Sequence, residues 1–235
     1  MRRAPCSVSV VRTLSPTEII GRAFAIYRDQ IGVLLPAALV VFAINAVVSW
    51  IFDHGLLALV AVVVSLVLAI LYDGMVVQLV RDVQDGRRDS SVAELFSSVS
   101  PVLLPLIGVS ILGGIGIGVG FVLCIVPGLF LLTFWSVVAP VTVIERPGVF
   151  RAFGRSWELV RGYAWPVFGT IVLVFLLVVA ASIAAALIGL AIGDVGRAIL
   201  SWLFNALTQP VAALTTSVLY FTLLEVRSAA ETPLP

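Results

Sequence analysis

Few residues in this 235-residue sequence have the types and spacing that catalysis requires. His54 is the only histidine, and with Asp53 beside it in a short turn it could form a lone acid–base pair. The alternative is that both are solvated residues of a polar turn. The sequence has no second imidazole for a metal cluster, and the spacing singles out no serine as a nucleophile. We therefore predict no catalytic residue, no metal site and no cofactor.

The two cysteines also offer little chemistry. Cys6 lies before the first apolar stretch and Cys124 within a later one, far apart in the sequence. Two lone thiols cannot build a metal site, and this placement argues against a disulfide between them.

A glycine-rich run covers residues 113–120. It has neither the Lys-Ser/Thr pair of a phosphate loop nor a G-x-G-x-x-G register. It lies inside an apolar stretch, where small residues four apart allow helices to approach closely. The pairs Gly114/Gly118 and Gly116/Gly120 therefore predict helix packing, and a flexible gate is the alternative.

One acidic residue, Asp73, lies well inside an apolar run, near its inner end. Charged groups at such depth pair with another group or mark a transport path. We expect Asp73 to pair with an interfacial arginine, either Arg81, Arg151 or Arg155, and the alternative is a proton or cation site.

Three amides are the deeper polar residues: Asn45, Asn205 and Gln209. Asn205 and Gln209 share a helical face, and Pro210 frees a backbone carbonyl one turn earlier. They predict hydrogen bonds between helices, with a small polar cavity as the alternative.

Four arginines cluster in one connection: Arg146, Arg151, Arg155 and Arg161. A guanidinium binds phosphate in a fork geometry, and a basic residue near an anionic membrane surface contributes about 1 kcal/mol. These residues are candidate contacts for anionic lipids, and the alternative is that they only set the membrane orientation.

The amino-acid composition indicates whether the chain is surrounded by water or by lipid. Hydrophobic residues make up 61% of the chain and charged residues 11%, where soluble domains have about 45–50% and about 25%. With a mean hydropathy of +1.18, the chain has too few charges for a water-exposed surface. All 14 basic residues are arginine, which is typical of a GC-rich bacterial genome, and a net charge of +1 gives no reason to expect a nucleic-acid partner.

Uncharged runs of about 20 residues predict membrane-spanning helices. Six are expected, with the third and fourth divided by a turn at Pro127-Gly128. Their approximate ranges are 31–52, 55–80, 101–125, 127–145, 163–193 and 198–224. All the arginines except Arg197 fall on one side of this arrangement, so the positive-inside rule predicts that both termini are cytoplasmic. The inner membrane of a bacterium is the expected location.

Similar cytoplasmic segments precede the first, third and fifth spans. Residues 15–18 and 91–94 both have the S-x-x-E form of a capping box, and Pro147 begins a third segment. Each has apolar residues at helical spacing opposite charged ones, which is typical of helices lying in the headgroup region. The expected apolar stripes comprise Ile20, Ala23, Phe24, Tyr27 and Ile31; Val92, Leu95, Phe96 and Val99; and Phe150, Phe153, Trp157 and Val160. We therefore predict three repeats, each a short amphipathic helix followed by a transmembrane hairpin.

Residues 127–166 carry a resemblance to a known family. Their most specific stretches are Pro127-Gly128-Leu129-Phe130, Glu145-Arg146-Pro147 and the run from Arg151 to Gly162. They resemble the bacterial membrane domain named for its attachment to some glycerophosphoryl diester phosphodiesterases, which also occurs as stand-alone proteins of unknown function. The ending Leu219-Tyr220-Phe221 with Glu225 and Arg227 is similar to the family's ending, with the acid and the arginine displaced. The resemblance implies a six-helix membrane domain and no phosphodiesterase activity, because the catalytic domain of those enzymes is a separate barrel.

The overall expectation is an all-α multi-pass membrane protein. Residues 1–14 are a flexible cytoplasmic N-terminus, residues 15–227 a single six-span domain and residues 228–235 a cytoplasmic tail. The expected function is non-catalytic: engaging anionic phospholipids or scaffolding a membrane-protein partner. A small-solute or lipid transporter is the second hypothesis, and a lipid-modifying membrane enzyme the third.

Overall fold

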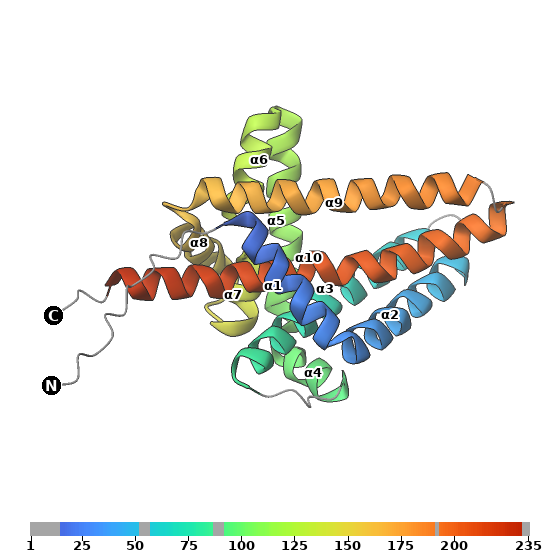
Figure 1. The fold of residues 1–235 in the computed structure, drawn as a ribbon, viewed down its shortest axis with the longest axis horizontal. Coiled ribbons are helices and arrows are strands. Elements are labelled where there is room, and N and C mark those ends of the chain that lie inside the picture. Colours follow the sequence, from blue (N-terminus) through green and yellow to red (C-terminus); the bar gives the residue numbers. More distant parts are fainter. Residues whose placement is uncertain (1–14, 52–56, 87–91, 191–192, 232–235) are drawn as a thin grey trace, which may run out of the picture.

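The computed structural model describes residues 15–51, 57–86, 92–190 and 193–231, and all regular structure in these ranges is helical (Figure 1). His54, Asp53 and Cys6 lie outside the described residues. The helices are α1 (Pro16–Asp29), α2 (Ile31–Ile51), α3 (Leu57–Gln84), α4 (Val92–Val99), the 3-10 turn η1 (Ser100–Val102), α5 (Leu103–Leu123), α6 (Ile125–Phe134), α7 (Val138–Ile144), α8 (Val149–Val160), α9 (Ala164–Leu190) and α10 (Gly193–Glu231).

Six helical segments in the described part of the chain are long and apolar enough to cross a membrane. They are Ile31–Ser49, Ala58–Gln84, Glu94–Leu123, Ile125–Ile144, Ala164–Gly189 and Trp202–Ala229. The predictions of an all-helical structure and of six helices long and apolar enough to cross a membrane are therefore confirmed for the described residues.

The turn between the third and fourth segments lies earlier than the sequence predicts. Cys124 is the extended residue that separates α5 from α6, so the break falls three residues before Pro127. Pro127 instead stands in the first turn of α6, where backbone N–H groups have no partner within the helix and a missing one costs little. Gly128 is needed for close packing, since an added Cβ would lie 2.5 Å from the Phe121 ring.

The fourth segment is two helices rather than one. Residues 135–137 form a turn between α6 and α7, and the Ser136 hydroxyl donates to the carbonyl of Thr133 there. This break places Trp135 beside Phe153 of α8, with ring centroids 4.7 Å apart.

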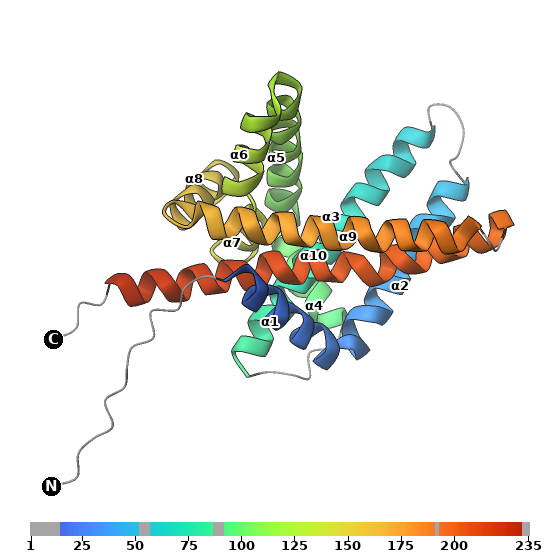
Figure 2. The same ribbon diagram turned by 45° about the horizontal axis from the view of Figure 1, so that its top comes forward.

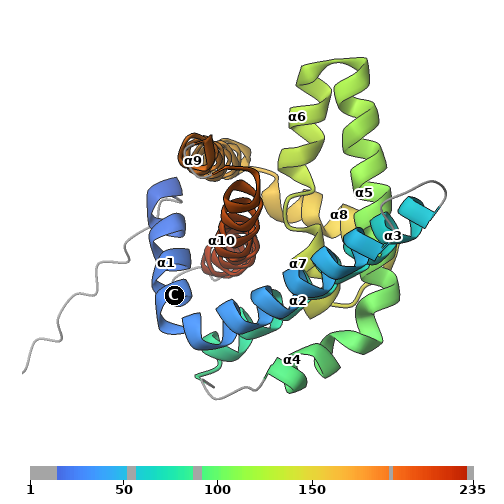
Figure 3. The same cartoon turned by 90° about the vertical axis from the view of Figure 1, so that its right-hand side faces the viewer.

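Helices next to each other in sequence lie side by side in three pairs: α2 with α3, α5 with α6, and α9 with α10 (Figures 1 and 3). The pairs point in different directions from a common base, with α5 and α6 standing apart from the long α9 and α10 (Figure 2). The shorter helices α1, α4, α7 and α8 pack around this base.

The core lies where α3 and α10 meet. Buried side chains concentrate in α3 from Ile70 to Val80 and in α10 from Ala206 to Leu223, and α4, α5, α7 and α8 add to them. The far ends of the pairs are exposed instead, as at Val122, which is 88% exposed. Exposed apolar side chains on such helices are what a lipid solvent favours.

The short helices use their apolar faces to pack on the protein. Helix α1 buries Ile19, Ile20 and Ala23 and contacts α9 and α10. The apolar stripes predicted for α1 and α8 are therefore only partly buried. Phe24 of α1 is 40% exposed and Phe150 of α8 is 80% exposed. The difference arises because contacts with distant helices, rather than helical periodicity alone, select the buried face.

Candidate functional site

The four candidate arginines surround α8, which lies at the same end of the molecule as the last turns of α10 (Figure 1). The chain enters α8 through a sharp reversal at residues 146–148. Arg146 adopts a left-handed backbone conformation with φ 52°, and Gly148 has φ 88°. This conformation costs a residue with a side chain roughly 1–2 kcal/mol, so the surrounding packing must hold Arg146 in place.

Arg155 is engaged within the protein. Its Nε lies 2.9 Å from Oε2 of Glu145, and its Nη1 lies 3.4 Å from Oε2 of Glu158. The hydroxyl of Tyr220, in α10, donates to Oε1 of the same Glu145 at 3.0 Å. Partial burial lowers the pKa of Arg155, but the hydrogen bonds and charges of Glu145 and Glu158 outweigh this effect and raise it overall. Arg155 thus joins α7, α8 and α10 as a permanent cation.

Arg227, to which the sequence analysis gave no role, caps α8 from α10. Its Nε donates to the carbonyl of Leu159 at 3.2 Å, and its Nη2 donates to the carbonyls of Arg161 and Glu158. The last carbonyls of a helix have no partner within it, and a cation there also interacts favourably with the helix dipole. The displaced Glu-x-Arg ending was the available signal, but the sequence does not show which helix end Arg227 reaches.

The other three arginines are exposed and make no ion pair within the described part of the chain. They are Arg146, Arg151 and Arg161. The backbone carbonyl of Arg161 accepts a hydrogen bond from Arg227, while the side chain of Arg161 is exposed. Of the four candidate arginines, Arg155 is therefore held in an ion pair, and the other three have N–H donors available to a ligand.

Arg146 differs from the other two in its surroundings. It lines a polar cleft of about 620 Å³ between α3 and α4, with Asp82, Asp85 and Glu94 also in its wall. The three carboxylates outnumber the guanidinium groups of Arg81 and Arg146 in this wall, and Arg81 already pairs with Asp85, so the cleft disfavours an anion. Arg151 and Arg161 are consequently the better candidates for a phosphate group.

Two of the candidate polar residues, Asn45 and Asp73, have partners from other helices. The hydroxyl of Ser65, in α3, donates to Oδ1 of Asn45, in α2, at 2.6 Å. The partner of Asp73 is the Gln209 side chain of α10, through a hydrogen bond.

The expected arginine partners of Asp73 are engaged elsewhere or remain unpaired. Arg81 pairs with Asp85 at 3.9 Å and Arg155 with Glu145. Arg81 lies two turns further along α3 and therefore cannot reach back to Asp73 while it pairs with Asp85. The side chain of Asn205 lies outside the described residues.

The four glycines of α5 have two environments. An added Cβ at Gly116 would lie 2.5 Å from Cζ3 of Trp135, and one at Gly120 would lie 3.0 Å from the Cα of Gly128. At Gly114 and Gly118 there is no atom within 4 Å of that position. Only one of the two glycine pairs thus permits a close approach within this chain.

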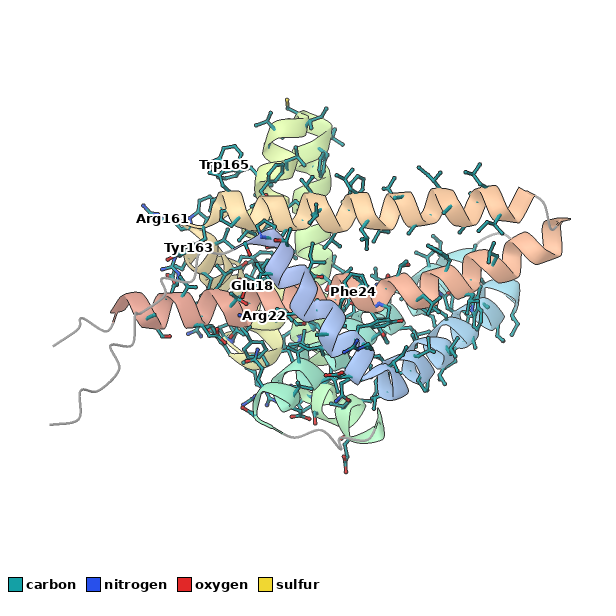
Figure 4. All side chains as sticks on the ribbon, in the orientation of Figure 1. Glu18, Arg22, Phe24, Arg161, Tyr163 and Trp165 are labelled. Carbon is teal, nitrogen blue, oxygen red and sulfur yellow. The ribbon has the colours of Figure 1, made fainter. Side chains whose placement is uncertain are left out.

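An apolar groove lies between α6 and the start of α9. Its volume is about 430 Å³, and Val126, Leu129, Phe130, Phe134, Trp165 and Phe168 line it together with Thr133 and Ala164. Trp165 is 83% exposed. Arg161, Tyr163 and Trp165 all project near the start of α9 (Figure 4), and Arg161 precedes Ala164 of the groove wall by three residues.

Comparisons of the chain with protein-family models, with curated proteins and with solved structures found no match. The site must therefore be interpreted from its own chemistry.

Proposed function

We propose that the chain is a non-catalytic membrane domain that binds the headgroups of anionic phospholipids, mainly through Arg151 and Arg161. The observation that supports this most is the division among the arginines. Arg155 is paired with Glu145 and Glu158, whereas the guanidinium groups of Arg151 and Arg161 are exposed and have no partner among the described residues, so their N–H forks are available to a ligand. Such forks match the geometry of a phosphate group.

The same proposal includes an orientation in the membrane. Each pair of neighbouring long helices would cross the bilayer as a hairpin, and α1, α4 and α8 would lie at the cytoplasmic interface before the three hairpins. The positive-inside rule supports this placement, since in the topology predicted from the sequence all the arginines except Arg197 fall on the same side as α8. Both termini would then be cytoplasmic, in the inner membrane of a bacterium.

The test is lipid retention in nanodiscs that contain equal parts of phosphatidylglycerol and phosphatidylcholine. Native mass spectrometry would measure the phospholipid that stays bound after extraction. The variant is Arg151→Gln with Arg161→Gln, and the matched control is Arg22→Gln with Arg28→Gln, which removes the same charge from α1. At about 1 kcal/mol for each arginine, the first variant should retain phosphatidylglycerol about 30-fold less strongly.

Each outcome has a definite meaning. A smaller loss in the α1 control supports specific headgroup binding. Equal losses in both variants would show that only the general surface charge acts and would overturn the proposal. A protein bound in stoichiometric amount in place of lipid would show instead that the domain scaffolds a membrane partner.

Transport of a small solute is a second candidate, favoured by the bond between Asp73 and Gln209 inside two apolar segments. Intramembrane carboxyl groups commonly mark ion or substrate paths. Solute flux in proteoliposomes that disappears with Asp73→Asn but survives Asn45→Ala would support it, since Asn45 forms a hydrogen bond between helices elsewhere.

A further inference from the structure

The groove between α6 and α9 has an apolar wall that offers a ligand few hydrogen-bonding groups. Thr133 supplies its one aliphatic hydroxyl, which donates to the carbonyl of Leu129 at 2.8 Å within α6. That hydroxyl is therefore already satisfied, and a polar solute would find few donors in the groove. Its volume of about 430 Å³ falls in the range of about 300–1,000 Å³ that is usual for ligand sites.

The α6 wall of the groove is held in place by α8. The ring of Phe134 stacks on Trp157 with centroids 4.1 Å apart, and Phe130 contacts both at 4.5 and 5.4 Å. The buried hydroxyl of Ser156 also donates to the carbonyl of Phe134 at 2.7 Å. A wall that is rigid before binding loses little entropy when a ligand enters.

A charged residue, Arg161, comes three residues before the α9 wall of the groove and suggests the kind of molecule that the groove holds. Arg161 ends α8, and its backbone carbonyl is fixed by Arg227, while its side chain is exposed and unpaired within the described residues. Trp165 is the second residue of α9, and its exposed indole is amphipathic, like the indoles found at membrane interfaces (Figure 4). An apolar groove next to a cation is complementary to a molecule with a long chain and an anionic head.

We infer that this groove holds one acyl chain of an anionic phospholipid whose phosphate group is bound by Arg161. The inference rests on the proposed function and deepens it, because it replaces general headgroup contact with a single bound lipid. A transmembrane helix of a partner fits less well. A helix is about 10–12 Å across with its side chains, and only single side chains of it would enter a groove of this volume.

The experiment uses phosphatidylglycerol with a photoreactive diazirine near the middle of one acyl chain, in phosphatidylcholine nanodiscs that hold the full chain. Mass spectrometry then locates the labelled residues. We expect label on Leu129, Phe130 and Phe168, and much less on the exposed far half of α9. Uniform labelling along α9 would overturn the inference, since it would show only a lipid annulus.

Ala164→Phe fills the groove, and Ala180→Phe adds the same ring to the exposed surface of the same helix. The first should reduce labelling of α6 roughly tenfold, comparable to the loss of about two buried methylene groups, and the control should leave it unchanged. Trp165→Ala is a second variant, which removes an exposed side chain from the groove wall. Because this side chain is exposed, a change in labelling would not result from misfolding. Unchanged labelling in both Ala164→Phe and Trp165→Ala would refute the groove as an acyl-chain site.

Failure of the inference can be separated from failure of the proposed function. If Arg151→Gln with Arg161→Gln weakens phosphatidylglycerol retention but neither Ala164→Phe nor Trp165→Ala alters labelling, headgroup binding stands and the groove is excluded. If the wild-type chain retains phosphatidylglycerol no better than phosphatidylcholine, both are wrong.

Discussion

Gly116 and Gly118 of α5 provide a test of how this protein is packed. They belong to the same helix and the same glycine-rich run, and each can be changed to alanine. The added Cβ would meet Cζ3 of Trp135 at 2.5 Å and Cη2 at 2.9 Å at Gly116, but no atom within 4 Å at Gly118. The two substitutions therefore differ in one respect, the contact with Trp135.

The magnitudes follow from two opposing effects. Alanine stabilises a helix interior over glycine by about 1 kcal/mol, and both variants gain this amount. In Gly116→Ala the Trp135 ring must also move, and it packs against Phe153 with centroids 4.7 Å apart. Overpacking of this kind costs typically 1–3 kcal/mol. We expect Gly118→Ala to be neutral or stabilising and to exceed Gly116→Ala by about 1–3 kcal/mol in the free energy of unfolding.

The assay is reversible unfolding in mixed micelles with increasing dodecyl sulfate, followed by circular dichroism. Gly114→Ala is a second control, because its added Cβ also meets no atom within 4 Å. A Trp135→Leu background should remove most of the difference between the two variants, since the ring is then absent. An unfolding free energy for Gly116→Ala equal to or above that of Gly118→Ala would refute the described packing of α5 against Trp135.

Two further predictions concern contacts between distant helices. Arg227→Met should lower the free energy of unfolding by about 2 kcal/mol, as expected for hydrogen bonds from a charged donor at a partly exposed helix end. The control Arg151→Met removes an exposed arginine and should change the free energy of unfolding by less than about 0.5 kcal/mol. Equal shifts of the melting temperature in the two variants would contradict the role of Arg227 as a cap. Asn45→Ala and Ser65→Ala should each destabilise the protein. In a double-mutant cycle the two changes should show a coupling energy of about 0.6 kcal/mol, the average for a hydrogen bond between membrane helices. A coupling energy near zero would show that this hydrogen bond contributes no stability.

The membrane segments were predictable because they depend on local composition. A run of about 20 uncharged residues has no stable place in water, whatever its neighbours, so the six segments could be located from hydropathy alone. Their internal breaks were less accessible. The turn at Cys124 and the division of the fourth segment at residues 135–137 depend on how α6 meets α5 and α8, and Pro127, the strongest local signal, tolerates the first turn of a helix.

The candidate site was only partly predictable for a related reason. The sequence identified the arginines around α8 as a group, but a pattern along the chain cannot tell which of them has a carboxylate nearby. Glu145 is ten residues before Arg155, and Tyr220 and Arg227 reach this site from more than fifty residues away. Asp73 was expected to pair with an arginine, and its hydrogen bond to Gln209 depends on α3 packing against α10.

The sequence by itself determined the all-helical class of this protein and the number of its long apolar segments, because hydropathy is a local property. The tertiary structure decided which arginine around α8 is ion-paired, which glycines of α5 have atoms packed against them and where the apolar groove between α6 and α9 forms. These are properties of pairs of surfaces. Helical periodicity assigns a side chain to a face, and only long-range packing determines what that face contacts.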